Sequence, residues 1–157
     1  MSRRPAAASA VLLIAGVLAL SGCTSTVSLQ PAADADEPAC ADVTVRLPAL
    51  VDGEERRWTD AQATGAWGDP ASVILTCGVT PPGPTTLPCQ SVNGVDWIID
   101  ESEAPRYRVT TFGRTPAVEV YLDNDLVSSA AVLDTLSRVV SVLPADGSAC
   151  TDAGTTP

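Results

Sequence analysis

The side chains of this chain that could do chemistry are its carboxylates and its cysteines. The sequence has 19 Asp and Glu residues and no histidine, so it lacks the imidazole base of a Ser-His-Asp or Cys-His site. Two carboxylates across a cleft can hydrolyse glycosidic bonds, and Asp96 with Glu119 is one such pair on paper. A chain this acidic offers pairs by chance, so we expect a protein that is not an enzyme.

The first of the five cysteines follows an export signal. Arg3 and Arg4 precede an apolar run over residues 6–20, which is the layout of a signal peptide and is short for a transmembrane helix. The run ends in Leu-Ser-Gly-Cys at Cys23, which resembles the lipobox of bacterial lipoproteins. This resemblance implies a signal peptide over residues 1–22 and a diacylglycerol on Cys23, with palmitate-type chains that hold the protein on the outer face of the cytoplasmic membrane. The alternative is an ordinary secretory peptide that leaves Cys23 as a free thiol.

The remaining four cysteines are an even number in an exported domain, which favours disulfides. They are Cys40, Cys77, Cys89 and Cys150. Three pairings are possible, and proximity in sequence favours Cys77–Cys89 with Cys40–Cys150. A zinc site is the alternative, but the chain has neither histidine nor a Cys-x-x-Cys pair. We therefore expect no metal and no cofactor.

The formal net charge is −10 and becomes −12 when Arg3 and Arg4 leave with residues 1–22. Nucleic-acid binding needs clustered cations, so this charge argues against a nucleic-acid partner. Cationic partners or divalent ions are compatible with it, although solubility explains it equally well. Asp123-Asn124-Asp125 lacks the glycine and the distal glutamate of a calcium loop, so helix capping is the better interpretation.

The elements that must position these residues form one α+β domain over residues 40–150. Residues 23–39 are polar and aperiodic, which predicts a flexible tether, and residues 151–157 a disordered tail. Apolar alternation predicts about five antiparallel strands in a meander, at residues 43–47, 73–77, 95–100, 107–112 and 118–122. We expect a loop or one irregular helical turn over residues 49–65. Apolar spacing from Leu126 to Leu143 predicts one C-terminal helix, capped at 123–125 and packed on one face of the sheet.

A cluster of aromatic and charged residues is the candidate ligand site of the domain. Its members are Trp67, Asp69, Asp96, Trp97, Tyr107 and Arg114. They form either core and rim packing or a small binding groove. For Arg114 we favour a structural clamp that bonds a turn carboxylate and stacks on an indole, and the alternative is a guanidinium that takes an anionic ligand.

Several motifs together resemble one protein family. They are Ala66-Trp67-Gly68-Asp69-Pro70, Leu75-Thr76-Cys77-Gly78-Val79, Pro88-Cys89, Val92-Asn93-Gly94-Val95-Asp96-Trp97 and Thr111-Phe112-Gly113-Arg114-Thr115-Pro116, with a late cysteine. The combination resembles the actinobacterial domain-of-unknown-function 3515 family of exported proteins over about residues 40–150. The resemblance implies an exported domain and brings no activity, cofactor or catalytic residue. An actinobacterial source also fits the abundance of Ala, Gly, Pro and Arg.

From these observations we expect a lipid-anchored, extracytoplasmic binding or accessory domain of the cell envelope. Its partners would be the membrane, through the anchor, and an envelope protein or polymer. The alternative is a carboxylate-based hydrolase of envelope glycans or peptides. The sequence predicts neither the ligand nor the oligomeric state.

Overall fold

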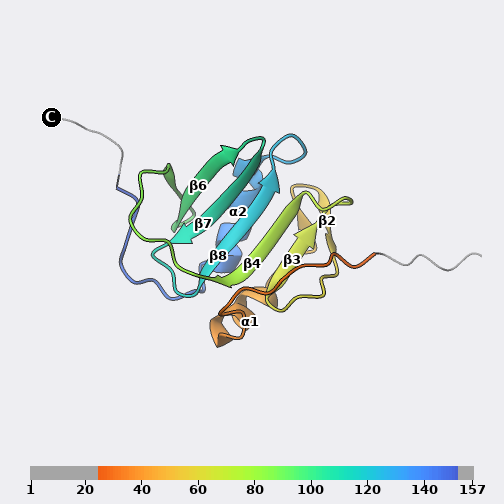
Figure 1. Cartoon of the computed structure of the whole chain (residues 1–157), viewed down its shortest axis with the longest axis horizontal. Helices are drawn as coiled ribbons and strands as arrows, with labels where there is room; N and C mark the ends of the chain where they lie inside the picture. The colour runs from red at the N-terminus through yellow and green to blue at the C-terminus, as the bar shows by residue number, and fades with distance from the viewer. Residues whose placement is uncertain (1–24, 152–157) are drawn as a thin grey trace, which may run out of the picture.

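A computed structural model describes residues 25–151, which form one twisted antiparallel sheet and two helices (Figure 1). The sheet has eight strands in the order β1-β2-β3-β4-β8-β7-β6-β5. The elements are α1 (Pro38–Thr44), β1 (Leu50–Val51), β2 (Glu54–Arg57), β3 (Thr64–Trp67), β4 (Val73–Val79), β5 (Cys89–Val92), β6 (Val95–Glu103), β7 (Arg106–Phe112), β8 (Ala117–Asp123) and α2 (Ser129–Val140). The expected α+β class with one C-terminal helix is confirmed, but the sheet has eight strands where we expected about five.

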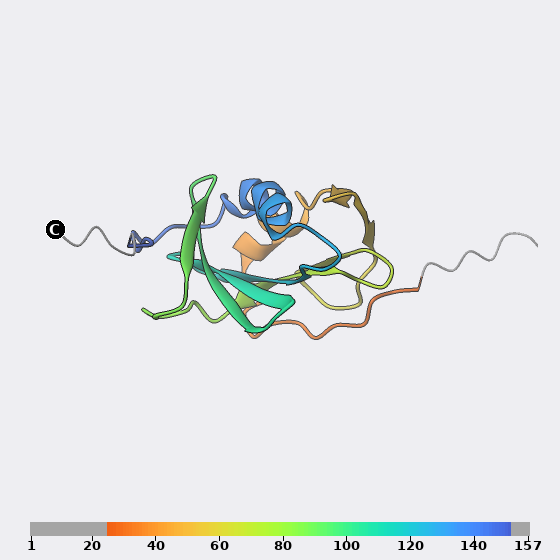
Figure 2. The ribbon, with the colours of Figure 1, turned by 90° about the horizontal axis from the view of Figure 1, so that it is seen from above.

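Helix α2 covers one face of the sheet, as Figure 2 shows edge-on. Its apolar side is buried at Val132, Leu133, Leu136, Val139 and Val140. The helix begins later than its apolar pattern predicts, because the side chain of Ser128 accepts from the amide of Ala131 and caps it. Of the expected caps, only Asn124 accepts from a first-turn amide, that of Ser129. Leu126 precedes the helix and is exposed, so its assignment to the apolar face was wrong.

The expected strand at residues 43–47 is instead the end of helix α1 and the turn after it. The spacing of Cys40, Val43 and Leu47 fits one face of a helix, and all three side chains are buried, whereas Val45, which a strand would place beside Val43 and Leu47, is exposed. Pro38 decides between the two, because proline at the first helical positions has a preset φ and needs no amide partner.

The expected loop at 49–65 contains β1, β2 and the start of β3. Its two-residue Asp52-Gly53 turn joins β1 to β2, with Val51 opposite Glu54, and this is the sequence signature of a tight hairpin. Strands β5 to β8 pair in chain order as an antiparallel meander. Chain order is broken only before them, because β4 pairs with β8 in the middle of the sheet and not with β5.

The segment before α1 lies along the domain on the face opposite α2 (Figure 2). The amide of Val27 donates to the carbonyl of Trp58 at 2.8 Å, and that of Asp34 donates to the carbonyl of Gly78 at 3.1 Å. Gly78 has a φ of +94°, and a side chain there would clash with the backbone of Asp34. These contacts differ from the flexible tether that we expected over residues 23–39.

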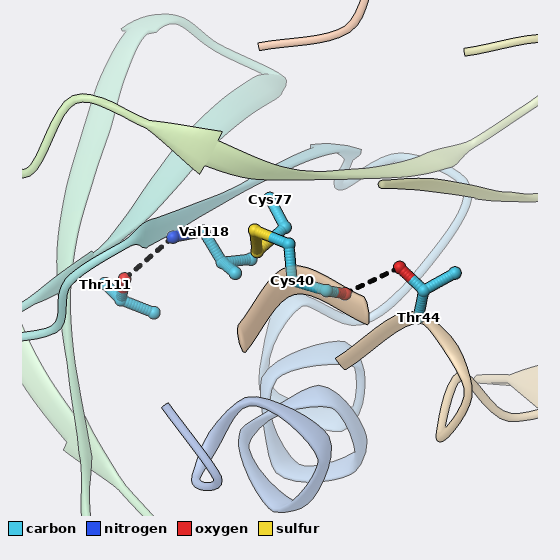
Figure 3. The surroundings of a disulfide bond; sticks show 5 residues. All are labelled: Cys40, Thr44, Cys77, Thr111 and Val118. Atoms are coloured by element: carbon cyan, nitrogen blue, oxygen red, sulfur yellow. Dashed lines mark hydrogen bonds between the residues drawn. A yellow bond between two sulfur atoms is a disulfide. The ribbon is translucent and has the colours of Figure 1, made fainter. Parts of the chain in front are cut away.

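The disulfides are Cys40–Cys77, drawn in Figure 3, and Cys89–Cys150, so the favoured pairing was wrong. Cys77 lies on β4 and Cys89 on β5, with β8, β7 and β6 between them in the sheet. Four strand spacings of about 4.8 Å separate β4 from β5 by about 19 Å, whereas a disulfide needs Cα atoms within about 7 Å. Helix α1 instead brings the Cα of Cys40 to 5.6 Å from that of Cys77.

Candidate functional site

The residues of the expected ligand cluster do not converge on one site. Trp67 and Trp97 are completely buried in the core. Each indole nitrogen has a partner there: Trp67 donates to the carbonyl of Pro48 at 3.0 Å, and Trp97 donates to the hydroxyl of Ser137 at 2.9 Å. Both tryptophans are therefore packing residues, which is one of the two interpretations left open by the sequence.

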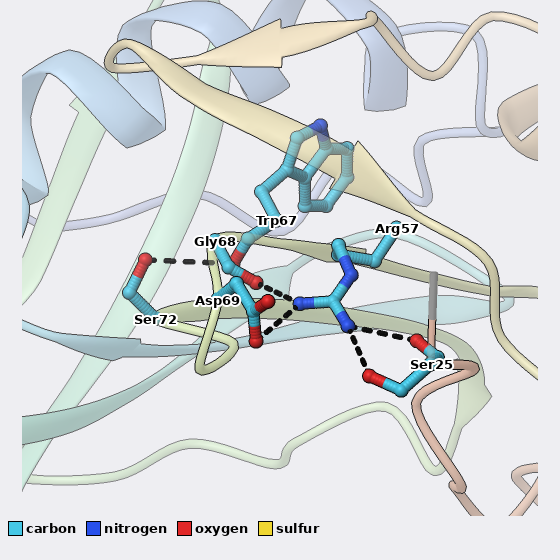
Figure 4. Close-up of polar contacts among 6 residues, drawn as sticks. All are labelled: Ser25, Arg57, Trp67, Gly68, Asp69 and Ser72. Atoms are coloured by element: carbon cyan, nitrogen blue, oxygen red, sulfur yellow. Dashed lines mark hydrogen bonds and ion pairs between the residues drawn. The ribbon is translucent and has the colours of Figure 1, made fainter. Parts of the chain in front are cut away.

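Asp69 pairs with Arg57, which the sequence analysis did not select (Figure 4). Nη1 of Arg57 lies 2.8 Å from Oδ1 of Asp69 and donates to the carbonyl of Gly68 at 2.9 Å. Nη2 donates to the carbonyl and hydroxyl oxygens of Ser25, both at 2.7 Å. The guanidinium thus joins the β3–β4 turn to the beginning of the described chain.

Arg114 is engaged by carbonyl oxygens, so the expected carboxylate and indole partners were wrong. Nη1 donates to the carbonyl of Leu143 at 2.6 Å and to that of Ser141 at 3.3 Å, and Nη2 donates to the carbonyl of Gly94 at 2.9 Å. Ser141 and Leu143 lie at the C-terminal end of α2, where carbonyls lack helical partners and a cation is favourable. The contacts make Arg114 a clamp between α2 and the β5–β6 turn.

Asp96 and Glu119, the carboxylate pair considered for hydrolysis, are each engaged elsewhere. Oδ2 of Asp96 accepts from the backbone amide of Cys150 at 2.7 Å, which holds the C-terminal segment beside β6. Oε1 of Glu119 lies 3.3 Å from Nη1 of Arg108, whose guanidinium lies over the ring of Tyr121. Each carboxylate thus has a structural partner of its own.

Tyr107 is the residue of the expected cluster that lines a hollow. We call this hollow the α2–β7 groove; it lies between α2 and the β5–β6–β7 end of the sheet and has a volume of about 520 Å³. That volume is within the range of small-molecule sites. The residues lining it are Gln90, Ser91, Val92, Asn93, Ile99, Glu101, Tyr107, Val109, Ser129, Ala130, Leu133 and Asp134. The lining combines apolar side chains with hydroxyl, amide and carboxylate groups.

Asn93 fixes the shape of the α2–β7 groove. It occupies the Asn93-Gly94 turn between β5 and β6, where both residues have positive φ. Its side-chain Nδ2 donates to the carbonyl oxygen and to Oδ1 of Asp134, each at 3.0 Å. The turn is therefore attached to α2, so the two walls of the groove are held together before any ligand binds.

Asp134 supplies a fixed negative charge to the groove. The hydrogen bond from Asn93 is the main cause that lowers the pKa of this carboxyl, and Arg138 contributes through its charge, with Nη2 at 2.6 Å from Oδ2. A general acid in hydrolysis needs the opposite shift, because it must carry a proton near neutral pH. Asp134 is therefore suited to accepting hydrogen bonds from a ligand and not to donating a proton.

A second hollow lies at the other edge of the sheet, between the end of α1 and β2–β3. We call it the Trp58 groove; its volume is about 590 Å³, and Thr44, Leu47, Ala49, Arg56, Arg57, Trp58, Thr59, Ala61, Gln62, Ala63 and Thr64 line it. Trp58 is 77% exposed. The sequence analysis placed this tryptophan in a loop and did not select it.

Two further expectations concern metals and membranes. Among residues 25–151, no group of three or more His, Cys, Asp or Glu side chains could hold a metal ion. In the same part of the chain, no helix is both long enough and apolar enough to cross a bilayer. Cys23 and the expected signal peptide lie outside the described residues.

Comparison with known proteins identifies a family and no activity. A family model described as "Protein of unknown function (DUF3515)" matches residues 6–147. No curated protein and no solved structure matches the chain.

Proposed function

The chain belongs to the DUF3515 family of proteins of unknown function, and we propose that it is a lipid-anchored, extracytoplasmic binding domain of an actinobacterial cell envelope that takes its ligand in the α2–β7 groove. Two disulfides join the four cysteines of residues 25–151 and indicate an oxidising, extracytoplasmic environment. The apolar leader followed by Leu-Ser-Gly-Cys supports the anchor at Cys23.

The α2–β7 groove is the observation that carries the binding role. Its lining combines an aromatic side chain, Tyr107, with several hydrogen-bonding groups and with apolar side chains. Sugar rings present the matching chemistry, because hydroxyls at their edges bind polar groups and their faces pack on aromatic rings. We therefore propose an envelope glycan as the ligand.

The hydrolase alternative receives less support from the same groove. Glu101 and Asp134 both line it, but the lowered pKa of Asp134 keeps that carboxyl ionised. A glycosidase of two carboxylates needs one of them protonated. Asp134 could therefore serve only as the ionised member of such a pair, and cleavage would depend on Glu101 as the acid.

The test is cosedimentation of the purified protein with isolated cell-wall sacculi. Tyr107→Ala should lower the affinity for sacculi by about 10- to 30-fold, since loss of a central aromatic contact costs roughly 1.4–2 kcal/mol of binding free energy. Tyr121→Ala is the matched control. In the β7–β8 register, Tyr107 is opposite Leu122 and Arg108 is opposite Tyr121. Successive pairs point to opposite faces of a sheet, so the two tyrosines lie on opposite faces.

Equal binding by the wild type and Tyr107→Ala would contradict the groove assignment. Release of soluble sugar from the sacculi by the wild-type protein would instead support the hydrolase.

A further inference from the structure

The described chain begins against the Trp58 edge of the domain. Arg57 holds Ser25 through two hydrogen bonds of 2.7 Å (Figure 4). Val27 then forms a parallel bridge with Thr59, and the amide of Leu29 donates to Oδ1 of Asp60 at 2.8 Å. Residues 25–29 are thus bound beside the segment that carries Trp58.

This attachment leaves very little chain between the domain and Cys23. Only Thr24 lies between Cys23 and Ser25, and the two peptide units that join them span about 7 Å at most when extended. A free tether of sixteen residues would reach about 20–25 Å. A lipid on Cys23 therefore brings the Trp58 edge of the domain close to the bilayer surface.

Trp58 has the chemistry of a side chain at a membrane surface. It is 77% exposed, whereas Trp67 and Trp97 are completely buried. An indole prefers the headgroup layer, because its ring is apolar and its N–H donates to polar groups there. Arg56 lines the same groove, where its Nη1 donates to the carbonyl of Leu47 at 3.1 Å and its other N–H groups can donate to lipid phosphates. Val45, next to Thr44 of the groove wall, is also 77% exposed.

From these observations we infer that the Trp58 edge is a membrane-docking surface, with the Trp58 indole in the headgroup layer of the bilayer. This inference rests on the proposed lipid anchor at Cys23. Docking at this edge orients the rest of the domain, because the α2–β7 groove lies at the β5–β6–β7 end of the sheet, across from β1–β2–β3. The ligand groove then lies on the side away from the bilayer.

The experiment uses the mature lipoprotein from cells fed labelled fatty acid, reconstituted in phosphatidylcholine–phosphatidylglycerol vesicles. Trp58 is the only exposed tryptophan among the three in the chain, so it dominates quenching by added reagents. Relative to the unlipidated Cys23→Ala protein in buffer, acrylamide quenching of Trp58 should fall at least threefold. Lipids brominated near the headgroup should quench it, and Trp58→Phe should lose both responses.

A reporter at the other end of the molecule is the matched control. Leu87 is 41% exposed and lines a hollow together with Cys150 and Thr151. This C-terminal end of the described chain lies on the other side of the molecule from its N-terminal end (Figure 1). Leu87→Trp in a Trp58→Phe background should remain accessible to acrylamide and unquenched by brominated lipid.

The outcomes separate docking from anchoring. If the protein carries the fatty-acid label but its Trp58 remains as accessible to acrylamide as in buffer, the docking surface is overturned and the anchor is left intact. The same conclusion follows if Trp58 is protected only in native membranes that contain other proteins. Absence of labelled fatty acid on the wild-type protein overturns the anchor and the docking surface together.

Discussion

Replacement of Arg114 by lysine tests whether the guanidinium clamp holds the end of α2. The two shortest contacts of Arg114 are 2.6 Å to the carbonyl of Leu143 and 2.9 Å to that of Gly94. The two hydrogen bonds are donated by different nitrogens of the planar guanidinium, Nη1 and Nη2, so the single ammonium group of lysine cannot reproduce both. Each hydrogen bond of a half-buried site contributes about 1 kcal/mol net.

We therefore expect Arg114→Lys to lower the free energy of unfolding by about 1–1.5 kcal/mol and Arg114→Ala by about 2–3 kcal/mol. For a domain of this size, 1 kcal/mol corresponds to about 3–5 °C in Tm. The assay is urea unfolding of the purified domain, followed by the fluorescence of its tryptophans and by thermal melting. The buried Trp97, which donates to Ser137 of α2, reports directly on the packing of this helix.

Arg138→Lys is the matched control on the same helix. Arg138 is exposed and pairs with Asp134 one turn earlier, and such surface pairs contribute about 0.5 kcal/mol or less. If Arg114→Lys is no less stable than Arg138→Lys, the carbonyl contacts do not stabilise α2 and the clamp interpretation fails.

Two further predictions concern the cross-links and acid. Replacing both Cys40 and Cys77 by alanine opens a loop of sequence separation 37, which should lower the free energy of unfolding by about 4 kcal/mol through chain entropy. Urea unfolding measures this loss. Peptide mapping that found Cys77 joined to Cys89 would contradict the pairing. The pKa of the Asp134 carboxyl is lowered in the folded protein, chiefly by the hydrogen bond from Asn93. The ionised carboxylate therefore stabilises the fold fully above its ordinary pKa near 3.9. This contribution to the free energy of unfolding is lost as the pH falls through the lower pKa of the folded state. The decrease in Tm between about pH 5 and pH 3 should therefore be smaller in Asp134→Asn than in the wild type, and an equal decrease would exclude this contribution.

The strands that the sequence predicted best are those with one apolar face. Residues 73–77, 95–100, 107–112 and 118–122 are rich in β-branched, aromatic and other apolar side chains, and each segment lies within a strand of the structure. Strands β2 and β5 have no fully buried residue, so hydrophobic alternation could not reveal them. Their turns, Asp52-Gly53 and Asn93-Gly94, carried the better signal.

The cysteine pairing could not be deduced from spacing, because it depends on strand order. Cys77 and Cys89 are close in sequence, yet their strands are separated by three others that come later in the chain. The same holds for the groove. Tyr107 was selected from its residue type, but the contact of Asn93 with Asp134 joins residues 41 positions apart, which only the fold brings together.

The disulfides also determine how the domain would carry mechanical load. A covalent path from one end of the chain to the other runs through Cys40–Cys77, along residues 77–89, and out through Cys89–Cys150. Residues 41–76 and 90–149 form closed loops outside this path, and they contain β1, β2, β3, β6, β7 and β8 in full. Twelve peptide units between Cys77 and Cys89 extend to about 40 Å. Once they are extended, tension applied between the two ends of the chain passes through sulfur–sulfur bonds, and most of the sheet bears none of it.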